Sequence, residues 1–255
     1  MIKNVFKISI FLLFILLVIC CKSDRPPIKK ETPKINAVVQ PIKINRINFY
    51  FENSGSINGY LDGDNFQQTV YRVLKNSAND SLIPYFVNTK EYFEPNIIDK
   101  IAKKNIKTHG VGNSDHKFIF TNAIKNAKGN NLSIVISDGI YSMKDGNIAL
   151  VEIDIEDAFK KALKYNELET VVLKMTSHFK GRYYSESCKK KGGTQIDQER
   201  PYYIILFGNK AVINKALNEI VIIKDLEGYK EQARFLITKD LKVNYSVLTK
   251  GEEKQ

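Results

Sequence analysis

Short apolar runs that alternate with amphipathic segments most strongly constrain the fold of this chain. From residue 46 onward, runs rich in β-branched and aromatic residues include 47–51 and 132–137. Between such runs, apolar residues recur at helical spacing, as in 64–78 and 154–166. Apolar strands divided by helices are typical of a sheet that is covered on both faces. The sequence therefore predicts a doubly wound α/β fold, with a mostly parallel central sheet and helices on both faces.

Composition excludes several other classes of protein. Hydrophobic residues make up 43% and charged residues 26% of the 255 residues, which excludes a disordered chain and a multi-span membrane protein. Only three cysteines are present, so the chain is not a disulfide scaffold. The formal net charge of +11 first suggests nucleic acid or an anionic surface as a partner.

The N-terminus has the pattern of an export signal. Lys3 and Lys7 are followed by an apolar run over 8–19, which is shorter than the roughly 20 residues that span a bilayer. The adjacent cysteines that follow resemble a bacterial lipoprotein signal, in which a lipid-modified Cys becomes the first residue of the mature protein. We favour Cys21 for lipidation, with 1–20 as the signal peptide, because a small residue precedes it. An uncleaved N-terminal anchor is the alternative, and both interpretations predict an exported protein tethered to a membrane.

Residues 21–45 are predicted to form a linker rich in proline and lysine. Four of the chain's seven prolines lie here, and this composition favours an extended spacer. Two lysines leave with the signal and four net positive charges lie in the linker, so the folded part carries a charge of only about +5. Because that charge is modest and an exported protein rarely meets DNA, we expect no nucleic-acid partner.

Oxygen-bearing side chains follow two of the predicted strands. The first strand ends in a segment that contains Glu52, Ser54 and Ser56, and a later strand ends at Asp138. Thr121 opens a predicted helix between them. Ligands of α/β sheets bind beyond the carboxyl ends of the strands, so these side chains are expected to converge there. Hydroxyls and carboxylates suit Mg²⁺ or Mn²⁺ better than Zn²⁺.

At these residues the sequence resembles a von Willebrand factor A (integrin I-like) domain. That family carries a metal-ion-dependent adhesion site built from Asp-x-Ser-x-Ser, a Thr in a second loop, and Asp-Gly after a later strand. The resemblance implies that Ser54, Ser56 and Thr121 coordinate the cation, and that Glu52 and Asp138 act directly or through water. It also implies that a carboxylate of the partner completes the shell. The sequence departs from the family at Glu52, where the family has Asp.

The resemblance implies one domain over 46–255, and an insertion around 176–200 stands out within it. About 26 residues separate the strand predicted to end near 175 from the strand predicted to begin at 202, and they mix basic and aromatic side chains. Such a segment can bind phosphate, sugar or acidic protein surfaces, and the alternative is a solvated hairpin insertion. The candidate partner-binding residues are Tyr60, Arg182, Tyr183 and Tyr184.

The resulting hypothesis is a binding module of the bacterial cell envelope rather than an enzyme. It is anchored by lipid and holds a protein or envelope-polymer partner, with Mg²⁺ or Mn²⁺ at the adhesion-like site. The alternative is an exported serine hydrolase that uses Ser54 with Asp138 and one of the histidines His109, His116 and His178. That alternative lacks the Gly-x-Ser-x-Gly motif, because residue 52 is Glu and residue 56 is Ser.

Overall fold

A computed structural model of the chain describes residues 42–78, 81–140, 148–163, 168–184 and 193–237. The strands are β1 (Arg46–Glu52), β2 (Leu82–Val87), β3 (Glu91–Phe93), β4 (Asn131–Ser137), β5 (Leu168–Tyr183), β6 (Thr194–Gly208) and β7 (Tyr229–Ile237). The α-helices are α2 (Asp64–Ser77), α3 (Ile97–Ala102), α4 (His116–Asn126), α5 (Ile148–Leu163) and α6 (Lys210–Glu219). Two 3₁₀ helices, η1 (Ile57–Tyr60) and η2 (Ile223–Asp225), complete the described elements.

The strands form one sheet in the order β3-β2-β1-β4-β6-β5-β7. β1 lies inside this sheet, between β2 and β4, and its residues after Arg46 are all buried because helices cover both faces. It pairs in parallel with β2 and with β4, and Phe51 is opposite Ile136. The carboxyl ends of β1 and β4 therefore lie side by side, with Glu52 next to Ser137.

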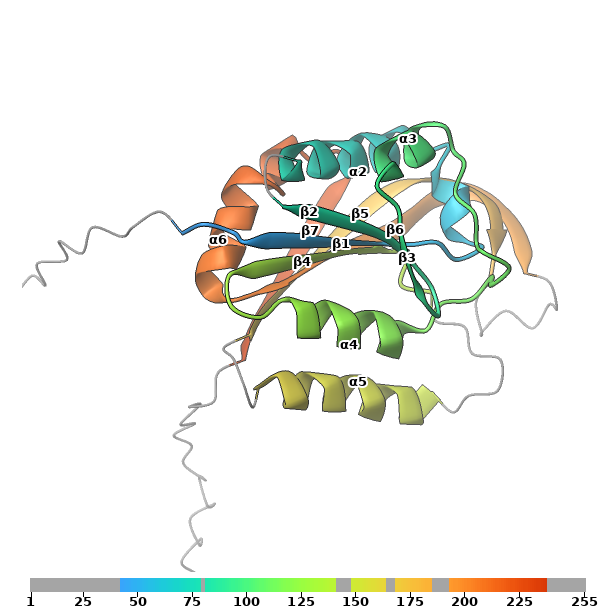
Figure 1. Ribbon diagram of the computed structural model, residues 1–255. Coiled ribbons are helices and arrows are strands. Elements are labelled where there is room, and N and C mark those ends of the chain that lie inside the picture. The colour runs from blue at the N-terminus through green and yellow to red at the C-terminus, as the bar shows by residue number, and fades with distance from the viewer. Residues whose placement is uncertain (1–41, 79–80, 141–147, 164–167, 185–192, 238–255) are drawn as a thin grey trace, which may run out of the picture. The chain divides into compact units, whose positions relative to one another are not determined.

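Helices cover both faces of the sheet, as Figure 1 shows. On one face lie α2 and α3, and α6 packs into the same hydrophobic core through Val212, Ile213 and Ala216. On the other face α4 packs against β1 and β4, with α5 outside it. This second core is smaller and includes Ile119 of α4 and Ala158 of α5.

The prediction of a doubly wound, mostly parallel sheet is wrong. Two strand pairs are parallel, β1–β2 and β1–β4, whereas β2–β3, β4–β6, β5–β6 and β5–β7 are antiparallel. The sheet is thus mixed and differs from the von Willebrand factor A-like fold that the resemblance implies. The physical reason lies in the connections: β5 and β6 pair directly, and parallel neighbours need a crossover of a dozen or more residues, usually a helix.

The stretch around 176–200 is largely strand rather than an inserted loop. β5 continues to Tyr183, β6 begins at Thr194, and the two strands pair from Glu169–Gly208 as far as Tyr183–Thr194. The alternation of buried and exposed residues along this part of β5, with Phe179 buried between two exposed neighbours, is that of a strand. This long hairpin packs against η1, immediately after the loop that carries Ser54 and Ser56.

No helix among the described residues is long and apolar enough to cross a membrane. The predicted signal peptide, Cys21 and nearly all of the predicted linker lie outside the described residues.

The contact between η1 and the hairpin leads to a stability prediction. A Cβ on Gly59 would lie 2.4 Å from ring atom Cε2 of Phe179, which is fully buried and cannot move aside. We expect Gly59→Ala to lower the free energy of unfolding by about 1–3 kcal/mol, because overpacking strains a dense core. A Cβ on Gly112 would meet nothing within 4 Å, so Gly112→Ala is the matched control, with an expected change below about 0.5 kcal/mol. Denaturant unfolding measures both, and equal effects would contradict this packing.

Candidate functional site

A cluster of polar side chains is buried at the carboxyl ends of β1 and β4. Glu52 ends β1, the loop after it carries Ser54 and Ser56, Ser137 ends β4, and Asp138 follows it. The exposed fraction of these side chains ranges from 0% for Glu52 to 4% for Ser54, Ser56 and Asp138. Buried polar groups are costly unless they are paired, so the contacts within the cluster determine its chemistry.

Hydroxyl groups link the β1 loop to the end of β4. The Oγ atoms of Ser54 and Ser56 are 3.2 Å apart, and the Ser56 hydroxyl donates a short hydrogen bond to Oδ2 of Asp138. The other carboxylate oxygen, Oδ1, accepts from the backbone N–H of Ile140 at 2.8 Å. Ser54, Ser56 and Asp138 are therefore within reach of a single ligand, as the sequence predicts.

Two hydrogen bonds hold the loop after β1 against the segment that precedes α4. The amide N–H of Gly55 donates to the carbonyl oxygen of Gly112 at 2.8 Å, and Nδ2 of Asn53 donates to the carbonyl of Lys107 at 2.7 Å. Gly139 has a φ of +67°, and a Cβ there would lie 2.8 Å from the ring of Tyr203. The turn after Asp138 thus requires glycine for both its conformation and its close packing.

Glu52 is neutralised by a histidine. Nε2 of His116, the first residue of α4, lies 3.7 Å from Oε2 of Glu52, and the Ser137 hydroxyl donates a short hydrogen bond to the same oxygen. Burial alone would raise the pKa of Glu52, but His116 and the hydroxyl lower it overall. Burial alone would lower the pKa of His116, whereas the Glu52 carboxylate raises it. Both pKa shifts favour the charged forms, in which a Glu52 carboxylate faces a His116 imidazolium.

Asp138 has no such partner. Among the described residues it forms no salt bridge, and its hydrogen bonds come from a neutral hydroxyl and a backbone N–H. Burial, with a smaller contribution from the Glu52 charge, raises the pKa of Asp138 to about 7. The cluster therefore contains one carboxylate that burial and a like charge hold near half-protonation at neutral pH. Such a group is stabilised by any cation that binds beside it.

Thr121 lies outside this cluster. It is exposed on α4, which begins at His116 rather than at Thr121, because Asp115 caps the helix by accepting from the N–H of Phe118. His116 therefore lies next to Glu52, although the sequence pattern does not predict a role for His116 in the cation site. A signal was present in Ser114-Asp115-His116, since Asp is a preferred N-cap residue.

The residues predicted to bind a partner lie at different depths. Tyr60 is buried, and its hydroxyl donates to the carbonyl oxygen of Pro201 at 2.5 Å. Tyr183 is half-buried, whereas Arg182 and Tyr184 are exposed near the end of the hairpin. Tyr184 lies beside the site, because a Cβ on Gly55 would be 3.7 Å from its ring atom Cε2.

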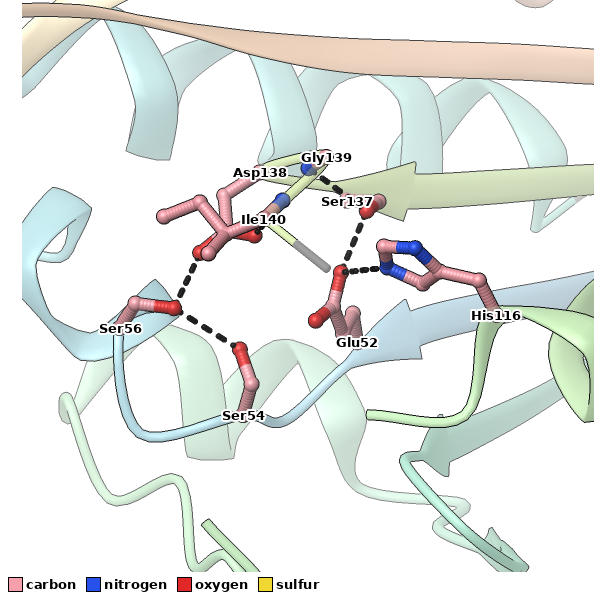
Figure 2. Close-up of polar contacts among 8 residues, drawn as sticks. All are labelled: Glu52, Ser54, Ser56, His116, Ser137, Asp138, Gly139 and Ile140. Carbon is pink, nitrogen blue, oxygen red and sulfur yellow. Dashed lines mark hydrogen bonds and ion pairs between the residues drawn. The ribbon is translucent and has the colours of Figure 1, made fainter. Parts of the chain in front are cut away.

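The arrangement of the oxygens is compatible with an octahedral cation. Figure 2 shows the oxygens of Ser54, Ser56, Asp138 and Glu52 facing one another across a common space. Adjacent ligands of Mg²⁺ at about 2.1 Å are about 3.0 Å apart, close to the separation of the two serine hydroxyls. Oε1 of Glu52 is buried and accepts no hydrogen bond from the described residues. It is thus an unused ligand in the same space.

The donor set is limited in charge. Within the described ranges, no group of three or more His, Cys, Asp or Glu side chains is arranged to share a metal ion. A cation here would depend on two hydroxyls and two carboxylates, one of which is already paired with His116. Hydroxyl and carboxylate oxygens suit Mg²⁺ or Mn²⁺ and suit Zn²⁺ poorly.

The pKa of Asp138 leads to a pH prediction for the protein without added metal. The folded protein keeps a proton on Asp138 up to about pH 7, whereas the unfolded chain releases it near 3.8, so this group makes the protein less stable as the pH rises. We expect the free energy of unfolding to fall by on the order of 2 kcal/mol between pH about 5 and 7. The raised pKa of His116 acts in the same direction at higher pH, and the lowered pKa of Glu52 matters only in acid.

In Asp138→Asn the group that titrates is absent, so we expect a nearly flat stability profile over this window. Chemical denaturation in chelator at several pH values measures both proteins. Parallel profiles for the wild type and Asp138→Asn would contradict the assignment.

Comparison with known proteins adds no relative. Searches against protein-family models, curated proteins and solved structures each find no match to this chain. The resemblance to the von Willebrand factor A family therefore stays a prediction from the motif residues around Ser54 and Asp138.

Proposed function

We propose that this protein is a membrane-tethered binding module that holds a protein or envelope-polymer partner through Mg²⁺ or Mn²⁺ at the cluster of Ser54, Ser56, Asp138 and Glu52. The observation that carries the proposal is Asp138, a buried carboxylate without a cationic partner among the described residues, bonded to Ser56. A divalent cation would replace the Ser56–Asp138 hydrogen bond with two metal–oxygen contacts and would remove the repulsion between Asp138 and Glu52.

The predicted lipid anchor at Cys21 and the linker over 21–45 fit this role. A domain on a flexible tether reaches partners at a distance from the membrane, and the tether raises their effective concentration. The proposed location is the bacterial cell envelope. A cation held by only four protein oxygens would keep open positions, which water or an oxygen of the partner would fill.

The contacts of Ser54 favour the binding module over a serine hydrolase. The Ser54 hydroxyl contacts the Ser56 hydroxyl rather than an imidazole, and a serine nucleophile needs an adjacent base. The three histidines are engaged elsewhere: His109 stacks on Tyr92, His116 faces Glu52, and His178 pairs with Asp197.

Calorimetric titration of the protein with Mg²⁺ and Mn²⁺ tests the cation site. We expect binding to the wild type, and at least about tenfold weaker binding to Asp138→Ala and Ser54→Ala, because each removes an oxygen ligand. Thr121→Ala is the matched control, since Thr121 is exposed on α4, and it should bind as the wild type does. Binding should also weaken as the pH falls below about 7, because the cation must displace the proton of Asp138. Identical heats for the wild type and Asp138→Ala would refute the site.

A further inference from the structure

Arg200 is a half-buried cation on β6 whose guanidinium lies over an aromatic ring. Its guanidinium carbon lies 4.3 Å from the centroid of the Tyr183 ring. Its Nε is buried without a hydrogen-bond partner, and it forms no salt bridge with the residues that the structure describes. On the same hairpin, Nζ of Lys180 and Nε2 of His178 lie 3.3 and 2.9 Å from the carboxylate of Asp197.

Arg200 lies on the same side of the sheet as Tyr60, next to the cation cluster. It is opposite Ser177 in the β5–β6 register, and the next residue, Pro201, accepts the hydrogen bond from Tyr60. Tyr60 ends η1, which begins directly after Ser56, so its hydrogen bond to Pro201 brings the part of β6 that carries Arg200 close to the β1 loop.

The chemistry of a single guanidinium favours a carboxylate. Its planar edge matches the two oxygens of a carboxylate in a bidentate pair, and a ring stacked beneath it keeps that edge in a fixed orientation. Phosphate groups are usually held by several arginines, whereas the described surroundings of Arg200 supply one. Because Nε itself is buried, a ligand carboxylate would bind the guanidinium through its terminal N–H groups.

We propose that Arg200 is a second anchor point of the same site and binds a carboxylate of an acidic protein segment. This inference rests on the proposed function, because a neighbouring carboxylate of the segment would complete the shell of the cation beside Asp138. The ring of Tyr184, which lies next to Gly55, would flank the bound segment. The net positive charge of the folded part favours an acidic partner electrostatically.

Calorimetric titration of the full chain in detergent with a hexa-aspartate peptide tests this assignment, in saturating Mg²⁺ and again in chelator. We expect Arg200→Gln to weaken peptide binding about tenfold or more, since hydrogen bonds to charged groups are the strong ones. Mg²⁺ affinity should stay within about twofold of the wild type, because Arg200 holds no cation ligand. Arg200→Lys should give an intermediate loss, as it keeps the charge without the planar fork.

Lys180→Gln is the matched control, because it removes a charge of the same sign from the same hairpin at an exposed pair, and we expect a change within about twofold. Equal losses in Arg200→Gln and Lys180→Gln would overturn the inference, since net charge alone would then explain binding. Displacement of the peptide by inorganic phosphate from the wild type but not from Arg200→Gln would also overturn it, in favour of a phosphate site.

The cation site and the carboxylate subsite at Arg200 can be refuted independently. If Mg²⁺ does not bind the wild type, the cation site is refuted, and the comparison of Arg200→Gln with the wild type in chelator still tests the carboxylate subsite. If Mg²⁺ binds and Arg200→Gln takes up the peptide as the wild type does, only the assignment of Arg200 is refuted. Unfolding midpoints of each variant close to that of the wild type exclude misfolding as the cause of a loss.

Discussion

The parallel pairing of β1 with β4 is the constraint on which the rest of the site depends. It sets Glu52 beside Ser137 and brings the loop with Ser54 and Ser56 to Asp138, so that two carboxylates are buried at one edge of the sheet. Only one of the two is neutralised, because His116 reaches Glu52 and leaves Asp138 with neutral donors. Burial, together with the charge of Glu52, raises the pKa of Asp138, and a cation is therefore the simplest addition that would stabilise the cluster.

The part of the site that could be predicted from the sequence depends on strand ends. Apolar runs over 47–51 and 132–137 identify two buried strands, and oxygen-bearing residues follow each directly. Since the two strands are parallel neighbours, the side chains after them meet, and Ser54, Ser56 and Asp138 do lie together. The same pattern could not reveal the neutralising histidine, because the contact between His116 and Glu52 depends on where α4 begins.

The other features of the fold and the site could not be predicted, because the sequence does not determine strand direction or helix boundaries closely enough. The run over 202–207 in β6 is continuously apolar, which is typical of strands in parallel sheets, so it favours the wrong strand direction. No helix is predicted between residues 175 and 202. Two strands without a helix between them are expected to form a hairpin, so this stretch indicates a hairpin rather than an insertion. Thr121 was placed at a helix start because a loop precedes it, but the side chain of Asp115 caps α4 and starts the helix earlier.

The most direct test of the cation site is anomalous X-ray diffraction from crystals of the protein grown with Mn²⁺. We expect an anomalous peak about 2.2 Å from the Oγ atoms of Ser54 and Ser56 and from a carboxylate oxygen of Asp138. Ordered Mn²⁺ elsewhere, with the hydrogen bond between Ser56 and Asp138 intact, would contradict it.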